Sequence, residues 1–138
     1  MRGRLGILVA AAGLLISGGP ILAHHSFAAE YDANQPLTLK GTVTKIEWTN
    51  PHARFYISVK DEKGTLTDWN LELASPNGLV RNGWTRTSLN VGDEVTVQGS
   101  AARDGSKMAN VRLVTLADGR QVFAGSSGGN TPIPPRQK

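Results

Sequence analysis

Three histidines are the residues of this sequence whose type and spacing best suit chemistry. His24 and His25 are adjacent near the start of the chain, and His52 lies in its first half. A histidine that is the first residue of a mature chain can chelate a metal ion through its α-amine and its own imidazole. The reference pKa is about 7.7 to 8.0 for the amine and about 6.5 for imidazole, so protons compete little near neutral pH. The histidines therefore predict a metal site, provided that the chain is cut immediately before His24.

Nitrogen ligands supported by carboxylate or water oxygens favour Cu(II), with Ni(II) and Zn(II) behind it. The arrangement resembles the histidine brace of copper proteins, in which a leading histidine chelates copper and a second histidine from the fold completes a T-shaped set of nitrogens. The resemblance implies that His24, with or without His25, is the leading group and that His52 is the second histidine. The candidates for oxygen ligands are Glu30, Asp32 and Glu72.

Two other interpretations of the same residues stay open. In the plainer one, His24 and His25 form a solvated chain end, and His52 packs against Trp48 or hydrogen-bonds a carbonyl group of a turn. In the other, a copper-dependent oxidase uses the same histidines with one coordination position open to oxygen. A domain of this size offers no obvious substrate cleft, so we expect a binding protein and not an enzyme.

The start of the chain predicts export. Arg2 and Arg4 precede an uncharged apolar run at residues 5–16, which is the order of a secretory signal peptide. The run breaks at residues 17–20, short of the roughly 20 apolar residues that a membrane-spanning helix needs. We therefore expect residues 1–23 to be removed, and the mature protein to be periplasmic or secreted without stable insertion in the membrane.

Composition excludes several classes of function. The 138 residues include no cysteine, which excludes disulfides, thiolate ligands, a cysteine nucleophile and lipid attachment at a cysteine. The formal charge of +4 includes Arg2 and Arg4, so the mature chain carries about +2. This charge is too small to indicate a nucleic-acid partner.

Five segments alternate apolar and polar residues, as half-buried strands do. They are residues 36–48, 53–60, 66–73, 91–99 and 108–116, and a last hairpin leads into residues 121–123. The apolar positions of the first segment change parity, which predicts a β-bulge near Thr44 and Lys45. The alternation predicts that these side chains face the core: Phe55, Ile57, Trp69, Leu71, Val91, Val95 and Val97.

A short helix is expected between the third and fourth strands. Ser75 suits the N-cap position and Pro76 the first helical position. The apolar side chains that would cover one end of a barrel are Leu79, Val80, Trp84 and Leu89. From Gly125 onward the composition is rich in Gly, Ser, Asn and Pro, which predicts a disordered tail.

Three strands, a short helical cap and two further strands follow the order of the OB barrel. We therefore expect an all-β, five- to six-stranded OB-like barrel at residues 36–124, between an N-terminal segment, residues 24–35, and a tail, residues 125–138. The loop between the first two strands of such a barrel borders its usual binding surface, and His52 lies in that loop.

This placement leaves a second function open, a metal-free adaptor or oligosaccharide binder that uses the outer face of the second and third strands. The side chains expected on that face are Arg54, Tyr56, Ser58, Asp68, Asn70 and Glu72.

Four longer stretches are similar to an uncharacterised family of small exported bacterial proteins, a domain of unknown function. They read HHSFAAEYD from His24, KGTVTKIEWTNPHARFY from Lys40, WNLELASPNGLVRNGW from Trp69 and LADGRQVFAG from Leu116. The resemblance covers nearly the whole mature chain and implies export and a small β domain. It implies no particular activity.

We predict that the mature protein begins at His24. Ala23 lies seven residues beyond the apolar run, which is the usual spacing, although the large Ile21 precedes it at the small-residue position. Ala28 fits the small-residue rule but lies farther away. N-terminal sequencing of the exported protein should read His-His-Ser. A sequence that starts at Ala29 would remove the chelate.

Overall fold

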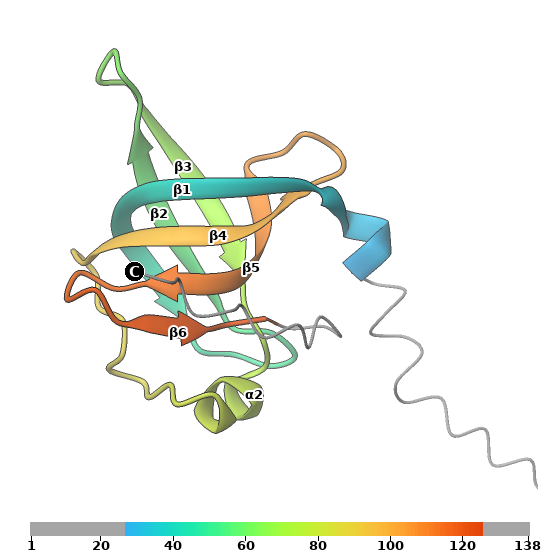
Figure 1. Ribbon diagram of the computed structural model, residues 1–138, viewed down its shortest axis with the longest axis vertical. Coiled ribbons are helices and arrows are strands. Elements are labelled where there is room, and N and C mark those ends of the chain that lie inside the picture. The colour runs from blue at the N-terminus through green and yellow to red at the C-terminus, as the bar shows by residue number, and fades with distance from the viewer. Residues whose placement is uncertain (1–26, 126–138) are drawn as a thin grey trace, which may run out of the picture.

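The computed structural model describes residues 27–125. The predicted signal peptide, His24, His25 and the tail beyond Gly125 lie outside this range. A helical turn at residues 27–30 leads into the first strand (Figure 1). The elements that follow are β1 (Tyr31–Glu47), β2 (Arg54–Lys60), β3 (Leu66–Glu72), α2 (Pro76–Arg81), β4 (Glu94–Ala102), β5 (Met108–Thr115) and β6 (Gln121–Phe123).

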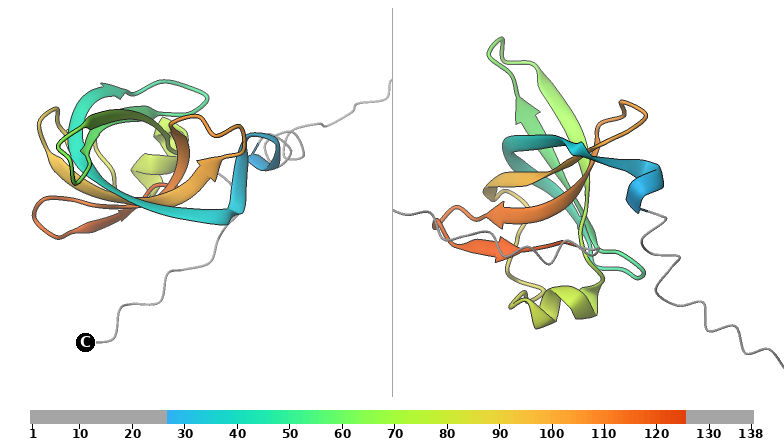
Figure 2. Two further views of the ribbon diagram at one scale, coloured as in Figure 1. Left: turned by 90° about the horizontal axis from the view of Figure 1, so that it is seen from above. Right: turned by 45° about the vertical axis from the view of Figure 1, so that its right-hand side comes forward.

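The strands form one sheet that closes into a barrel. Its order is β3-β2-β1-β4-β5-β6, and every neighbouring pair in this order is antiparallel. A parallel pairing of β3 with β5 closes a ring of five strands, which Figure 2 shows from above. The protein is therefore an all-β, OB-like barrel, as predicted from the order of its elements.

β1 bends so that it can pair with two neighbours. Its register with β2 shifts between Val43 and Lys45, which is where the change of parity predicted a bulge. The bulge allows both Val43 and Ile46 to pack against the core. β1 begins at Tyr31, earlier than the predicted start at Pro36, because Tyr31 pairs with Ala102 of β4.

α2 covers one end of the barrel and is held by its first residues (Figure 1). The hydroxyl of Ser75 accepts a hydrogen bond from the Gly78 amide at 3.2 Å, and Pro76 lies in the first turn, as predicted. Leu79 is fully buried, whereas Val80 is exposed. The prediction that Val80 covers the barrel is wrong, because consecutive residues of a helix point about 100° apart.

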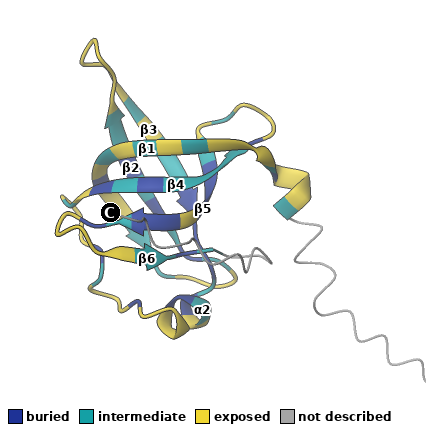
Figure 3. Cartoon of the chain, in the orientation of Figure 1, coloured by how far each residue is buried: buried dark blue, intermediate teal, exposed yellow. Residues whose placement is uncertain are grey.

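One further core prediction is wrong, and another holds in part. Val91 is exposed because β4 begins only at Glu94, so the alternation does not extend back to it. Trp69 packs against the core, as predicted, but it is only half-buried, and Lys107 lies over its ring with Nζ 5.2 Å from the centroid. Trp69 is less buried because β5 pairs only with residues 70–72 of β3. Beyond this pairing, the β2–β3 hairpin extends past the closed, five-stranded part of the barrel (Figures 1 and 3).

We predict that Leu71→Ala lowers the free energy of unfolding by about 2 to 5 kcal/mol, because Leu71 is fully buried where β3 meets β5. Leu66→Ala on the same strand should change it by less than about 0.5 kcal/mol, because Leu66 is exposed. Urea unfolding of both variants measures the difference. Equal effects would contradict the assigned faces of β3.

Candidate functional site

Glu72 is the buried carboxylate of the described residues, with 7% of its surface exposed. Glu72 lies on the outward-facing side of β3, as predicted. In the β2–β3 pairing it is opposite Arg54. This outward-facing carboxylate is nevertheless shielded from solvent. Tyr31 and Arg54 both contact Glu72 and exclude water from it.

Both oxygens of Glu72 are engaged. Oε2 accepts hydrogen bonds from the Tyr31 hydroxyl at 3.1 Å and from Arg54 Nη2 at 2.5 Å. Oε1 accepts one from Asn110 Nδ2 at 3.3 Å and lies 3.7 Å from His52 Nδ1. We call these five residues the Glu72 network. It joins the start of β1, strands β2, β3 and β5, and the β1–β2 loop.

Tyr31 is held as a neutral hydrogen-bond donor. Burial, reinforced by the negative charge of Glu72, raises the pKa of its phenol well above the usual value of 10.0. The hydroxyl therefore remains protonated throughout the physiological range, and Glu72 keeps this donor.

His52 is oriented by the backbone of the chain that follows β3. Its Nδ1 lies 3.0 Å from the carbonyl oxygen of Leu73. Since a carbonyl can only accept, Nδ1 carries the hydrogen, and in the neutral ring Nε2 keeps its lone pair. Among residues 27–125, Nε2 makes no hydrogen bond, and the side chain is 33% exposed. A hydrogen bond to a carbonyl is what the plainer interpretation expected of His52.

The segment before β1 is fastened to the β4–β5 loop, residues 103–107. Arg103 Nε donates to the Ala28 carbonyl at 2.7 Å, and the Arg103 amide donates to the Glu30 carbonyl at 2.9 Å. The Phe27 ring lies 5.8 Å from that of Tyr31. The two predicted N-terminal ligands precede Phe27 and lie outside the described range.

The candidate oxygen ligands do not form a metal-binding group within the described residues. Asp32 accepts hydrogen bonds from the Asn34 amide and the Gln35 side chain, which hold the pKa of its carboxyl below the usual range. Glu30 is exposed, and Glu72 is taken up by its network. Within the described part of the chain, no three His, Asp or Glu side chains are grouped to bind a metal ion.

The predicted outer face of strands β2 and β3 is partly occupied by its own members. Arg54 Nη1 donates to Asn70 Oδ1 at 3.1 Å, in addition to its bond with Glu72. Tyr56 donates its hydroxyl hydrogen to Glu47 Oε2 at 3.1 Å. An oligosaccharide on this face would have to displace these contacts.

Sequence reasoning missed two members of the network. Tyr31 lies in the segment that was expected to precede the barrel, and its role depends on an unpredicted pairing with Ala102. Asn110 carried a weak signal, because it is a polar residue between the apolar Ala109 and Val111, both buried. A buried amide in such a position needs a hydrogen-bond partner.

Comparisons with known proteins identify the family of this chain. A protein-family model described as a family of unknown function matches residues 12–111. No curated protein matches. One similar solved structure is a crystal structure of the mitochondrial single-stranded DNA binding protein Rim1 of S. cerevisiae. It is 15% identical, with a TM-score of 0.48, and the match covers 60% of this chain and 94% of that chain. No helix within residues 27–125 is long and apolar enough to cross a membrane.

We predict that the stability of the protein falls as pH rises above about 10 and that Tyr31→Phe removes part of this fall. The folded-state pKa of Tyr31 is raised, so above the unfolded-state pKa the folded chain retains a proton that the unfolded chain releases. The stabilisation that comes from the raised pKa of Tyr31 is complete below about pH 10 and is lost as the pH rises above that value. At pH 7 the variant should be less stable by about 1 kcal/mol, because Glu72 loses a donor.

Urea unfolding of both proteins between neutral pH and pH 11 tests this prediction. Tyr56 provides the matched control, because Tyr56→Phe removes a hydroxyl from a partly exposed pair with Glu47. Parallel pH profiles for wild type and Tyr31→Phe would contradict the assignment.

Proposed function

This chain belongs to a family of unknown function (DUF6152), which supplies no activity, and we propose a function from its own residues. The protein is an exported binding module that holds a transition metal, with Cu(II) favoured. The ligands are the α-amine and imidazole of His24, with or without His25, and the imidazole of His52. The nitrogen-rich ligand set is the reason for favouring Cu(II).

The orientation of His52 is the observation that carries this proposal. Histidines that bind metals usually donate their other ring hydrogen to a carbonyl or carboxylate, which fixes the tautomer and the direction of the ring. His52 makes such a bond from Nδ1 to the Leu73 carbonyl, with Glu72 Oε1 at 3.7 Å. Its Nε2 therefore has the lone pair that a metal ion requires.

The anchoring of Tyr31 supports the second part of the proposal, that the N-terminal histidines and His52 bind the same metal ion. Tyr31 and His52 lie against the same carboxylate, so the chain that leads to the N-terminal histidines starts beside the ring that would complete their site. His24 is seven positions before Tyr31, a length that spans at most roughly 25 Å. A tether of this length keeps the chain end at a high effective concentration near His52.

The residues of the site then have separate tasks. His24 would supply the chelate and His52 the ligand that the barrel fixes in place. The Leu73 carbonyl would orient His52. Glu72 would not bind the metal, because Tyr31, Arg54 and Asn110 already occupy its oxygens. The proposal requires export with removal of residues 1–23, because only that cut gives His24 a free α-amine.

We predict that Cu(II) binds tightly only when the native N-terminus and His52 are both present. Adding one alanine before His24 separates the α-amine from the imidazole and leaves every side chain in place. His52→Gln removes the ring nitrogen and keeps an amide that can donate to Leu73. Each change should weaken Cu(II) binding by at least about tenfold. Loss of a group that only supports a metal ligand already lowers metal affinity about 10- to 100-fold.

Calorimetry on the exported protein and these two variants, at one pH near neutrality, measures the affinities. His52→Ala is the second variant at that position, and the melting temperatures show whether each protein is folded. Equal affinities in all proteins would refute the site and favour the metal-free adaptor or oligosaccharide binder.

A further inference from the structure

Arg103 attaches the segment that leads to the N-terminal histidines. It follows directly after the end of β4. Its side-chain Nε donates to the Ala28 carbonyl at 2.7 Å, and its own amide donates to the Glu30 carbonyl at 2.9 Å. Within the described part of the chain, the two hydrogen bonds that join the helical turn at residues 27–30 to the barrel therefore come from one residue.

The helical turn depends on a partner of this kind. Four residues are too few for a helix that is stable by itself, and the last carbonyls of a helix have no partner within it. A positive charge at this end of a helix is also favourable. Arg103 supplies two donors and a charge to the turn, and the Phe27 ring adds a contact with the Tyr31 ring, 5.8 Å away.

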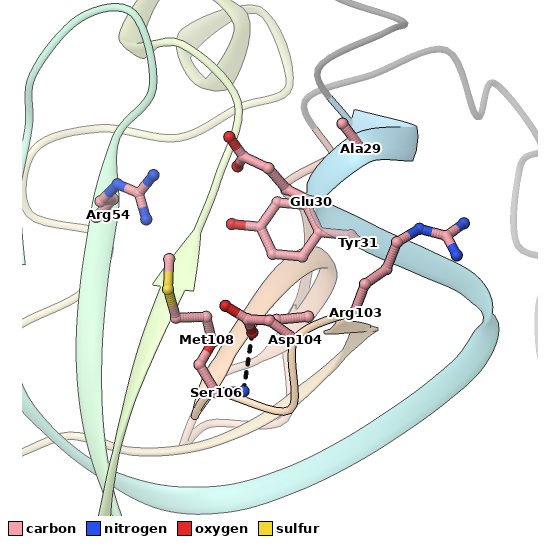
Figure 4. A pocket seen from close by; sticks show the side chains of 9 residues that line it. Ala29, Glu30, Tyr31, Arg54, Arg103, Asp104, Ser106 and Met108 are labelled. Carbon is pink, nitrogen blue, oxygen red and sulfur yellow. Dashed lines mark hydrogen bonds between the residues drawn. The ribbon is translucent and has the colours of Figure 1, made fainter.

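A cavity of about 370 Å³ lies beside this segment. Residues 29–31 line one side of it, and Arg54 and Met108 line the other (Figure 4). The Tyr31 side chain points toward Arg54, whereas the Arg103 side chain extends toward the helical turn (Figure 4). Because the cavity leaves this side of the segment without close packing, the place of the turn depends strongly on the Arg103 bonds.

Asp32 gives Arg103 a third contact, on the other side of Tyr31. The guanidinium Nη1 lies 3.7 Å from Asp32 Oδ2, and the Arg103 side chain is 48% exposed. An ion pair this exposed adds little to stability. It does hold the guanidinium between Asp32 and Ala28, which directs Nε to the Ala28 carbonyl.

Anchoring at Ala28 shortens the free chain before the barrel. His24 is seven positions before Tyr31 but only four before Ala28. Four residues span at most roughly 14 Å, compared with roughly 25 Å for seven. The effective concentration of a tethered group falls roughly as the −3/2 power of the tether length, so this shortening raises it about two- to threefold.

We propose that Arg103 is a positioning residue of the metal site, which holds residues 27–30 so that the N-terminal histidines and His52 meet on one metal ion. The inference rests on the proposed function. Arg103 itself does not bind the metal, and its positive charge repels Cu(II). Loss of the charge alone would therefore strengthen Cu(II) binding, whereas loss of the anchor weakens it.

Arg103→Ala tests this role, because it removes the contacts with Ala28 and Asp32 and keeps the amide bond to Glu30. Calorimetry with Cu(II) on the exported protein should show binding about two- to threefold weaker than that of wild type. Melting temperatures show that each variant is folded. Unchanged or tighter binding by Arg103→Ala would overturn the proposal.

Two further variants separate the hydrogen bond from the charge. Arg103→Gln places an amide nitrogen at the same distance along the side chain as Nε, so it keeps a donor for Ala28 and should bind at least as tightly as wild type. Arg120→Ala is the matched control, because it removes an exposed arginine that pairs with Asp118 before β6, and it should also bind as wild type does. Binding by Arg103→Gln as weak as that of Arg103→Ala would contradict the role of the Ala28 bond.

Combination with His52→Gln distinguishes positioning from a general loss of structure. Without the His52 ring, the anchor has no second ligand to serve, so Arg103→Ala should not weaken Cu(II) binding further. An equal loss in both backgrounds would overturn the proposal. If wild type and His52→Gln bind Cu(II) equally, the proposed metal site fails and the role of Arg103 fails with it. If they differ while Arg103→Ala matches wild type, only the role of Arg103 is refuted.

Discussion

The burial of one ionised carboxylate, that of Glu72, determines the geometry of the candidate site. A charge removed from water is tolerated only when donors surround it, and removing the oppositely charged partner from a buried ion pair typically costs about 3 to 5 kcal/mol. Here the donors are Tyr31, Arg54 and Asn110, which come from β1, β2 and β5. The carboxylate therefore ties the start of β1 to the outside of the barrel, next to His52.

Local signals were sufficient to predict most of the barrel. The alternation of strands, the Ser75-Pro76 helix start and the bulge before Lys45 each depend on a few neighbouring residues, and the structure confirms them. The error at Val91 arises because the local pattern continues beyond the start of β4, and the error at Val80 arises because neighbouring residues of α2 point in different directions. Where an element ends depends on pairing with distant strands, and a single sequence does not reveal that pairing.

Only those parts of the candidate site that depend on residues close together in the sequence could be predicted. His52 lies in the turn between two segments with clear strand patterns, so its place in the β1–β2 loop could be predicted. The network around it could not, because the Tyr31–Glu72 and Asn110–Glu72 bonds join residues that are 41 and 38 positions apart. They depend on the β1–β4 and β3–β5 pairings, which bring the partners onto one outer face.

Tyr31 connects the Glu72 network to the neighbouring cavity of about 370 Å³ through different atoms. Its hydroxyl group bonds to Glu72, the carboxylate beside His52, and its side chain lines the neighbouring cavity. The segment that would carry the N-terminal ligands toward His52 is thus the same segment that walls the cavity. A change at Tyr31 would disturb both the Glu72 network and the cavity wall, whereas His52 does not line the cavity. Substitution of His52 therefore tests metal binding while leaving the cavity wall unchanged, which a truncation of the N-terminal segment would not do.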